Sequence, residues 1–277
     1  FPGQREMVRG PVLDNNELEE ILDKYVRATR LAYERGADGI DFKLCHGYFA
    51  GLLLRPNNNR EDNYGGSFDN RTRFLREYTN RAKKEVGDSK FLFTTRMNAW
   101  DGGFAGGFGM AAPVSDESGK SWIRDYSEVE RVYSLLDSLG YSLVNVSAGI
   151  GVPRGMFNPG TGIHPNFVYL QELALHAKTT FKAMNSDVVV ASTGWSSLGP
   201  YSLPIGEKYL EKGLDFVGFG RWQLCEPFLP KIALEGARKT EIAPREYIEE
   251  ESNVCIACSK CGAGLQGAGP VSCPIYQ

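Results

Sequence analysis

Hydrophobic residues along this chain alternate between two spacings, one typical of amphipathic helices and one typical of short buried strands. From residue 15 to residue 36, apolar side chains recur every three or four positions, between an Asn at the start and a Gly at the end. Residues 39–45, GIDFKLC, then form a short β-rich run. The same alternation continues to residue 237. It predicts further strands at residues 91–97, 143–149, 187–193 and 216–220, and further helices at 70–87, 126–139, 166–181, 203–212 and 226–237.

Alternating strands and helices predict an α/β fold with a parallel sheet and right-handed crossovers. The long connections, 47–69, 98–125, 150–165 and 194–202, all follow a strand. A (β/α)8 TIM barrel builds its active site from loops in this position, so we expect a TIM barrel. A doubly wound sheet is the alternative, but its glycine-rich dinucleotide turn is absent from the sequence. Only five strands are visible, so three more are expected before Phe1 or from another chain.

Composition and charge add little to this picture. The chain has 277 residues, 42% hydrophobic content and a formal net charge of -3, which suits one large globular domain or two small ones. No apolar run approaches the roughly 20 residues that span a bilayer. The start, FPGQREMVRG, lacks the layout of a signal peptide, and the sequence has no basic stripe for nucleic acid. We expect a cytoplasmic location, with no membrane or nucleic-acid partner.

Glycines and an arginine stand at the ends of the last two predicted strands. Gly194 and Trp195 belong to the run STGW, and Gly220 and Arg221 belong to GFGR. Glycine lets a backbone approach a ligand closely, Arg offers a charged fork for phosphate oxygens, and the last two loops of a barrel commonly bind phosphate. These residues are therefore candidate phosphate ligands; alternatively, the glycines only relieve crowding. Arg96, at the end of an earlier strand, would point a cation into the same barrel mouth or form a structural ion pair.

The end of the strand 39–45 and the loop after it carry Lys43, His46 and Tyr48. Histidine can donate a hydrogen bond to a carbonyl or a flavin edge, and a tyrosine phenol can donate a proton. Each residue also has a structural alternative, such as a buried His bonded to a backbone carbonyl or a Tyr packed at the barrel rim. Spacing alone supports both interpretations equally. The neighbouring Cys45 is expected to be a buried or site-lining thiol without a catalytic role.

Four of the six cysteines lie close to the end of the chain, at C-x2-C-x2-C-x11-C spacing. This spacing suits metal ligation better than a disulfide framework, so a reducing compartment is expected. Three closely spaced thiolates followed by a distant Cys-Pro are typical of a [4Fe-4S] cluster, whereas a zinc ribbon uses two separate C-x2-C pairs. A zinc site stays the alternative. The candidate ligands are Cys255, Cys258, Cys261 and Cys273.

Residues 36–74, GADGIDFKLCHGYFAGLLLRPNNNREDNYGGSFDNRTRF, resemble the signature of the old yellow enzyme superfamily of flavin-dependent oxidoreductases. The chain is especially similar to the iron-sulfur branch, which includes 2,4-dienoyl-CoA reductase and trimethylamine dehydrogenase. The resemblance implies a barrel that binds FMN, of which residues 1–240 supply strands four to eight, and a [4Fe-4S] segment over residues 241–277. In many members a further region binds FAD and the electron donor NAD(P)H. The missing barrel portion and such a region or subunit are therefore expected partners.

The resemblance also implies roles for individual residues. His46 matches the second member of the His-x-x-His/Asn pair that binds a substrate oxygen, and Tyr48 matches the proton donor. Lys43 departs from the pattern, because many relatives carry the first histidine there; its ammonium could still stabilise an oxyanion. Arg96 matches the arginine at the flavin pyrimidine edge. The phosphate-binding turns are matched by Gly194, Trp195, Gly220 and Arg221. The four clustered cysteines match the cluster ligands.

The implied reaction is reduction of an activated C=C bond in an α,β-unsaturated carbonyl or thioester. Reduced FMN gives a hydride to the β-carbon, His46 and Lys43 polarise the carbonyl, and Tyr48 protonates the α-carbon. The cluster relays electrons. Two alternatives stay open: an amine-type dehydrogenase that passes electrons from substrate to the cluster, and an incomplete, non-catalytic fragment. The run NYGGSFDNRTRF is expected to be structural, with a Gly-Gly turn, a helix cap at Asp69 or Asn70, and ion pairs of Arg71 and Arg73.

Overall fold

The computed structural model describes residues 12–87, 90–101, 107–109, 113–114, 121–122, 125–149, 166–239, 244–256, 258, 260–261 and 272–276. The chain divides into two compact units. The first unit consists of Phe1–Arg154 and Thr179–Val189, and the second of Gly155–Lys178 and Val190–Gln277.

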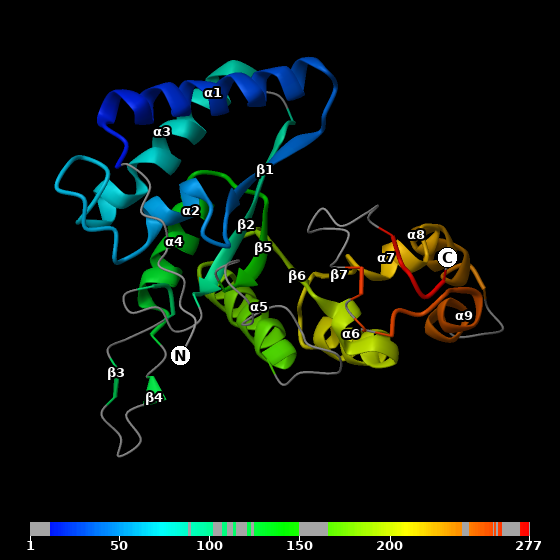
Figure 1. The fold of residues 1–277 in the computed structure, drawn as a ribbon. Helices are drawn as coiled ribbons and strands as arrows, with labels where there is room; N and C mark the ends of the chain where they lie inside the picture. The colour runs from blue at the N-terminus through cyan, green and yellow to red at the C-terminus, as the bar shows by residue number, and fades with distance from the viewer. Residues whose placement is uncertain are drawn as a thin grey trace. The chain divides into compact units, whose positions relative to one another are not determined.

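Within the described residues, five parallel strands alternate with helices along the chain (Figure 1). The strands are β1 (Gly39–Leu44), β2 (Leu92–Trp100), β5 (Leu143–Ala148), β6 (Val189–Thr193) and β7 (Phe216–Gly218), with a short antiparallel pair of β3 (Pro113–Val114) and β4 (Ser121–Trp122). The helices are α1 (Asn15–Glu34), α2 (Phe49–Leu54), α3 (Phe68–Val86), α4 (Ser127–Ser138), α5 (Asn166–Ala183), η1 (Trp195–Tyr201), α6 (Ser202–Glu211), α7 (Trp222–Cys225), α8 (Leu229–Gly236) and α9 (Pro244–Glu251). The α/β class expected from the alternation is confirmed.

Helix α1 begins where the sequence supplies a capping box. The Asp14 side chain accepts hydrogen bonds from the backbone N–H groups of Asn16 and Glu17, and the Glu17 carboxylate accepts one from the Asp14 N–H at 2.7 Å. Such a cap contributes about 1 kcal/mol to helix stability. The helix therefore starts at residue 15, as predicted, but its cap is Asp14.

The sheet of the first unit has one apolar face. Strands β1, β2 and β5 pair in parallel, and successive residues of each strand point to opposite faces. On the apolar face, Phe42 stacks on Tyr78 of α3 with ring centroids 4.1 Å apart, and Tyr25 of α1 packs edge-on against Phe42 at 5.3 Å. Helices α1 and α3 lie side by side (Figure 1). Their contacts with Phe42 make this face the core of the first unit.

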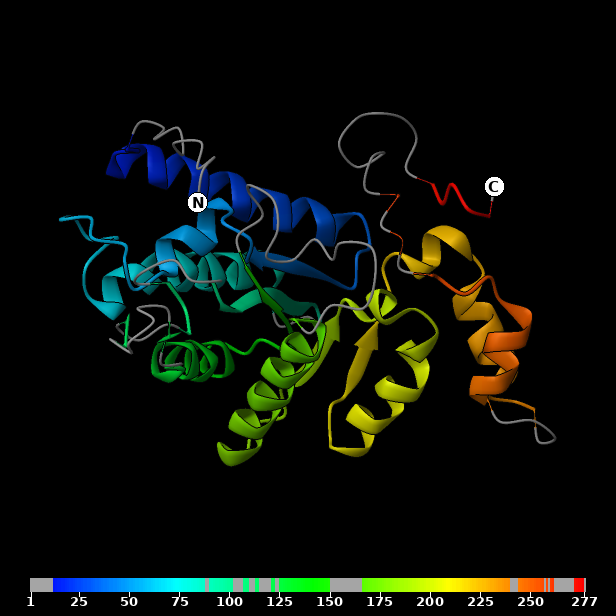
Figure 2. The same ribbon diagram turned by 60° about the horizontal axis from the view of Figure 1, so that its bottom comes forward.

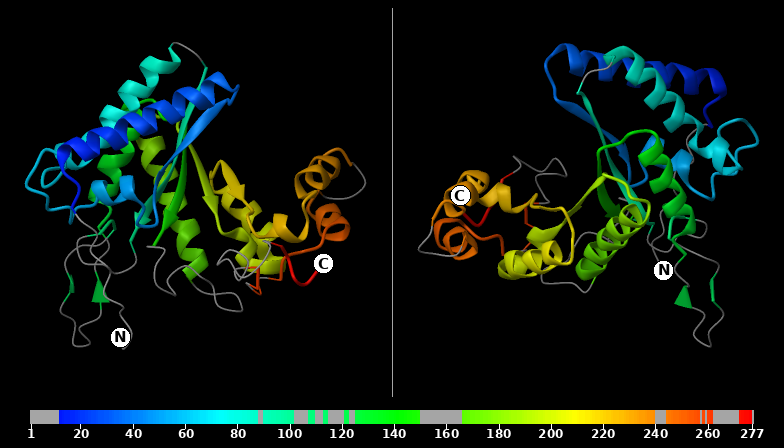
Figure 3. Two further views of the ribbon diagram at one scale, coloured as in Figure 1. Left: turned by 45° about the horizontal axis from the view of Figure 1, so that its top comes forward. Right: turned by 180° about the vertical axis from the view of Figure 1, so that it is seen from behind.

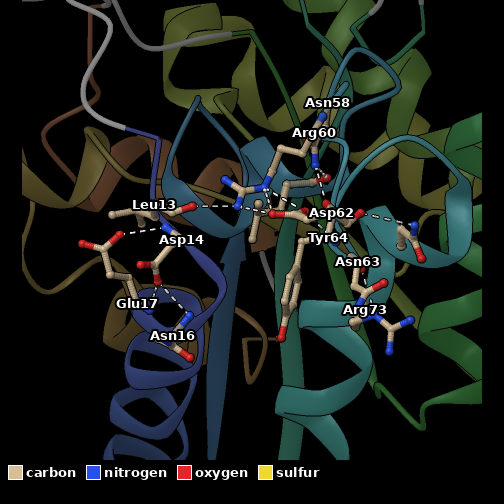
Figure 4. Close-up of polar contacts among 12 residues, drawn as sticks. Leu13, Asp14, Asn16, Glu17, Asn58, Arg60, Asp62, Asn63, Tyr64 and Arg73 are labelled. Carbon is tan, nitrogen blue, oxygen red and sulfur yellow. Dashed lines mark hydrogen bonds and ion pairs between the residues drawn. The ribbon is translucent and has the colours of Figure 1, made fainter.

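The loop before α3 is held by polar contacts around Arg60 (Figure 4). Arg60 donates to the Leu13 carbonyl at 2.6 Å and pairs with Asp62, so it ties this loop to the segment before α1. A Cβ at Gly65 would lie 2.5 Å from the Arg60 carbonyl oxygen, which is closer than real Cβ contacts. The Gly-Gly turn is therefore a steric requirement of this loop.

The expected cap of α3 at Asp69 or Asn70 is wrong. The side chain of Ser67 accepts from the Asn70 N–H at 3.3 Å and caps the helix, which therefore begins earlier than the sequence suggested. The expected ion pairs are confirmed. Arg71 lies 2.8 Å from Glu128, and Arg73 lies 3.7 Å from Glu77.

The second unit contains the pair of parallel strands β6 and β7 and the cysteine-rich segment. Helix α6 lies next to β7 (Figure 2), and α8 and α9 lie side by side (Figure 3). The side chains of Trp222, Cys225, Leu229 and Ile248 form a buried cluster against which Val254, Cys255 and Cys273 pack. The cysteine-rich segment is therefore anchored on the core of α7, α8 and α9.

Some elements differ from the prediction. The expected helix 226–237 begins later than predicted: Glu226 adopts φ -136° and ψ 86°, and α8 begins at Leu229. The residue before a proline avoids the helical region, and Pro227 follows Glu226. The short helices α2, η1, α7 and α9 and the strands β3 and β4 were not predicted. In the part of the chain that the structure describes, no helix combines the length and apolarity needed to cross a membrane.

Candidate active site and cysteine pocket

The second face of β1, β2 and β5 is polar. Lys43, Arg96 and Asn145 are register neighbours across the three strands, and Asn98 lies beside Ser147 one row closer to the strand ends. Globular proteins cover parallel sheets on both faces, usually with apolar side chains. A face that carries two cations and two amides instead is suited to a polar ligand.

His46 follows β1 and contacts residues of β2 and β5. Its φ of 60° lies in the left-handed region, which costs a residue other than glycine roughly 1–2 kcal/mol. Its backbone N–H donates to Asn98 Oδ1 at 3.4 Å, and its ring Nε2 lies 2.7 Å from Ser147 Oγ. Burial lowers the pKa of His46 to about 4, and the charges of Arg96 and Lys43 act in the same direction. His46 is therefore a neutral imidazole with one ring nitrogen already engaged.

Lys43 and Tyr48 form a pair at the end of β1. The Lys43 Nζ lies 3.3 Å from the centre of the Tyr48 ring, and the Tyr48 side chain is 58% exposed. A cation–π contact at an exposed position is worth roughly 0.5–1 kcal/mol, so it orients these side chains more than it stabilises the fold. The structure thus brings the predicted residues Lys43, His46, Tyr48 and Arg96 together at one end of the first unit's sheet.

Cys45 is buried beside this group, as expected. Burial raises the pKa of its thiol to about 11, although the nearby charges of Arg96 and Lys43 act in the opposite direction. The thiol is therefore protonated at neutral pH, which fits an inert side chain.

The predicted phosphate residues lie in the second unit. Gly194, after β6, has φ 93°, a conformation that favours glycine, and a Cβ at Gly220 would meet no atom within 4 Å. The Trp195 side chain is fully buried and donates its indole N–H to the Ser192 carbonyl at 3.0 Å. Only the backbone of Trp195 is therefore suited to touch a ligand.

One pocket of the second unit brings the four clustered cysteines together. Its walls include Cys255, Cys258, Cys261 and Cys273, together with Arg221, Leu224, Ile256, Pro274, Ile275 and Tyr276. All four thiols are free of disulfides and partly exposed. The Tyr276 hydroxyl donates to the Val254 carbonyl at 3.0 Å, which ties the segment after Cys273 to the residue before Cys255. The wide sequence gap before Cys273 is thus closed in space.

The cysteine sulfurs do not converge on a single ion position. Among the described residues, no group of three or more His, Cys, Asp or Glu side chains is placed to hold one metal ion. A single zinc ion needs all four sulfurs at about 2.3 Å from one point. In a [4Fe-4S] cluster each thiolate binds a different iron, so the sulfurs are further apart. The pocket gathers the four free thiols that either group would need.

Cys225 is a fifth cysteine close to this pocket. It is buried against Cys255 and Cys273, and its thiol donates to the carbonyls of Trp222 at 3.0 Å and Asn253 at 3.2 Å. Burial raises the pKa of this thiol to about 12. The hydrogen bonds to backbone carbonyls and the position of Cys225 in the buried cluster indicate a packing residue.

Two residues of the polar face, Asn98 and Ser147, were not predicted as site residues. Asn98 and Ser147 hold His46, and both stand two positions after another polar residue of the same strand, Arg96 and Asn145 respectively. This period-two polar spacing at strand ends was the available signal.

Several known proteins are similar to this chain. Residues 4–114 match the model of the NADH:flavin oxidoreductase / NADH oxidase family. The NADH oxidase of Thermoanaerobacter brockii is 30% identical over 249 residues, 88% of this chain and 32% of that enzyme. Two solved structures share the fold. 2-Naphthoyl-CoA reductase is 20% identical with a TM-score of 0.70, covering 95% of this chain and 34% of that one. Histamine dehydrogenase from Rhizobium sp. 4-9 is 23% identical with a TM-score of 0.65. The match covers 95% of this chain and 33% of that one. The chain spans about a third of each of these proteins.

Proposed function

We propose that this chain, which belongs to the NADH:flavin oxidoreductase / NADH oxidase family, forms part of an FMN-dependent enzyme that reduces an activated C=C bond. The proposed architecture is the last five strands of a (β/α)8 barrel followed by a [4Fe-4S] segment. Parallel strands alternating with helices and a polar second sheet face support it. The remaining strands and a region that binds NAD(P)H, with or without FAD, are proposed to lie elsewhere in the full-length protein or in a partner subunit.

The polar face of the first unit fits the ring of a flavin. Arg96 offers cationic donors, and Asn145 Oδ1, in the next strand, is buried without a hydrogen-bond partner among the described residues. A buried acceptor of this kind calls for a donor, which the N–H of a flavin pyrimidine ring can provide. Gly194, Trp195, Gly220 and Arg221 are the proposed phosphate ligands. Bound FMN would supply the hydride.

His46, Lys43 and Tyr48 are the proposed substrate residues. Because Nε2 of His46 is engaged with Ser147, Nδ1 is the ring nitrogen left to donate to a substrate carbonyl oxygen. A neutral ring that donates from Nδ1 must accept at Nε2, so the Ser147 hydroxyl would donate. The Lys43 ammonium would stabilise the negative charge that develops on the substrate oxygen. The Tyr48 hydroxyl would give its proton to the substrate α-carbon.

The contact of His46 with Ser147 is the observation that carries this proposal. The contact leaves Nδ1 of the neutral His46 ring available. The Lys43 ammonium and the exposed Tyr48 phenol belong to the same strand end. A neutral donor beside a cation is suited to a carbonyl oxygen, which gains negative charge during hydride transfer.

The four cysteines of the pocket are the proposed ligands of a [4Fe-4S] cluster. Their free thiols and their common pocket support it. A bound cluster would supply one-electron transfer between FMN and its donor.

An amine dehydrogenase is the second candidate, because the chain shares its fold with histamine dehydrogenase. In that reaction electrons would leave the substrate. The positive charges of Lys43 and Arg96 would repel a protonated amine, whereas they favour a carbonyl oxygen that gains negative charge. Alkene reduction is therefore our first candidate.

The two candidates differ in what oxidises and reduces the flavin. The full-length protein should be purified, its flavin identified, and the flavin reduced anaerobically with NAD(P)H. We expect bound FMN, and we expect an α,β-unsaturated carbonyl or thioester to restore its oxidised absorption. Bleaching of the oxidised flavin by amines, with no response to alkenes, would favour the dehydrogenase. A protein without flavin would contradict both.

A further inference from the structure

A buried carboxylate lies at the centre of a polar network in the first unit. Asp101 is fully buried, and its two oxygens accept four hydrogen bonds. Oδ2 accepts from Arg55 Nε at 2.9 Å and from the Phe108 N–H at 2.9 Å. Oδ1 accepts from Arg55 Nη2 at 3.1 Å and from Asn98 Nδ2 at 2.7 Å. The carboxylate is thus saturated, and it joins the end of α2 to the end of β2.

Asp101 determines which way the Asn98 amide faces. The Nδ2 of Asn98 donates one hydrogen to Asp101 Oδ1 and the other to the Gly149 carbonyl, both at 2.7 Å. With its nitrogen held by two acceptors, Asn98 presents Oδ1 to the backbone N–H of His46. A flipped amide would place donors against the His46 N–H.

Asn98 therefore binds the backbone of His46 and the backbone of the segment that follows Ser147. It binds the His46 backbone directly, and it binds Gly149, which is two residues after Ser147 at the end of β5. His46 needs this support because its left-handed backbone is unfavourable for a residue with a side chain. We propose that Asp101, held by Arg55, is a positioning residue that acts through Asn98 to fix His46 against Ser147.

Stability alone does not explain this network. A buried ion pair is often neutral or unfavourable for stability compared with packed apolar side chains, because desolvation offsets its attraction. The same unit has another ion pair with a buried arginine, Arg71 with Glu128 at 2.8 Å, in which the Glu128 side chain is 26% exposed. No hydrogen bond or ion pair described here links Glu128 to Asn98 or His46, so it is a matched control.

The experiment compares Asp101→Asn, Asn98→Leu and the control Glu128→Gln in the full-length protein. The ring of His46 is observed by NMR of 15N-labelled histidine and is assigned with His46→Gln. In the parent protein the ring should stay neutral well below the ordinary histidine pKa of 6.5, since its own pKa is lowered to about 4. In Asp101→Asn and Asn98→Leu the ring should leave Ser147, gain solvent and titrate closer to the ordinary value. Glu128→Gln should leave the titration unchanged.

A kinetic measurement accompanies the NMR measurement and depends on the proposed function. We expect kcat/KM for alkene reduction to fall by about 10- to 100-fold in Asp101→Asn and Asn98→Leu, because small displacements of a binding group cost rate steeply. In Asp101→Asn, whose side chain lies outside the polar face, reduction of the flavin by NAD(P)H should not change.

The positioning role is overturned if folded Asp101→Asn and Asn98→Leu keep the His46 titration of the parent, or if Glu128→Gln shifts it equally. If Asp101→Asn does not fold, Asn98→Leu decides alone. If the parent protein reduces no alkene, the proposed function fails, while the NMR result still decides the role of Asp101.

Discussion

Ser147 Oγ lies 2.7 Å from Nε2 of His46, although the two residues are 101 positions apart in the sequence. The contact joins the loop after β1 to the end of β5, two strands that do not pair with each other but both pair with β2. It engages Nε2 and leaves Nδ1 as the ring nitrogen proposed to bind the substrate. The proposed polarisation of a substrate carbonyl depends on this selection.

Ser147→Ala removes the partner of Nε2 and tests its importance. Without this hydrogen bond the His46 ring can rotate and change tautomer, and one hydrogen bond is worth about 1 kcal/mol. We expect kcat/KM for alkene reduction to fall about 5- to 10-fold. Steady-state kinetics of the full-length protein measures this. The control is Ser142→Ala, because Ser142 precedes the same strand and its hydroxyl donates to the Phe93 carbonyl at 3.2 Å. An equal loss in both variants would show a general structural effect.

The neutral state of His46 should make stability depend on pH. The pKa of this ring is about 4 in the folded protein and ordinarily 6.5. Between these values the unfolded chain binds a proton that the folded protein does not bind, so the free energy of unfolding falls as pH decreases from 6.5 towards 4. His46→Gln should reduce this slope and leave the curve above pH 6.5 unchanged. Urea unfolding at a series of pH values measures it, and identical slopes would argue against a buried neutral ring.

The cysteine pocket predicts that its four candidate ligands are needed for metal binding and that Cys225 is not. Replacing Cys258 or Cys273 by Ser should strongly reduce the iron and acid-labile sulfide of the purified protein, because a [4Fe-4S] cluster uses all four ligands. Cys225→Ser should keep the metal content of the parent, since Cys225 is directed at backbone carbonyls. Elemental analysis under anaerobic conditions measures both. Stoichiometric zinc without iron would overturn the cluster assignment.

The turn before α3 predicts a steric effect on stability. Gly65→Ala places a Cβ against the backbone of Arg60, so the turn must shift, and we expect a loss of about 1–3 kcal/mol in the free energy of unfolding. The control is Gly206→Ala in α6, where the nearest atoms would be 3.7 Å away. Alanine is favoured over glycine inside a helix by roughly 0.5–1 kcal/mol, so this variant should be neutral or more stable. Denaturant unfolding compares the two, and equal effects would contradict the steric argument.

The sequence predicted the strands and long helices because their signals are local. The helix at residues 15–34 and the strand at 39–44 were visible from apolar spacing alone, and Lys43, His46 and Tyr48 stood out as reactive side chains after a strand. Cap assignment was less successful. Ser67 caps α3, whereas Asp69 and Asn70 looked equally suitable, because only the geometry of the preceding turn decides among neighbouring polar residues.

The network around His46 could not be predicted in the same way. Asp101 meets Arg55 across 46 residues, and Asn98 meets His46 across 52. These contacts depend on which strand ends are neighbours in space, which a single sequence does not state. The positive φ of His46 was also not predicted, because histidine is enriched among residues with a left-handed backbone but most histidines do not adopt it.

The central claim is that the strand-end residues of this chain complete the reduction of an activated alkene. The most direct test is the reoxidation of the reduced flavin by an α,β-unsaturated carbonyl or thioester in Tyr48→Phe, followed in a single turnover of the full-length protein. The account predicts that reoxidation slows by about 10²- to 10⁴-fold, because the α-carbon loses its proton donor. Flavin reduction by NAD(P)H should keep its parent rate, and the control Tyr33→Phe should change neither step. Equal rates of alkene-dependent reoxidation in Tyr48→Phe and the parent protein would contradict the account.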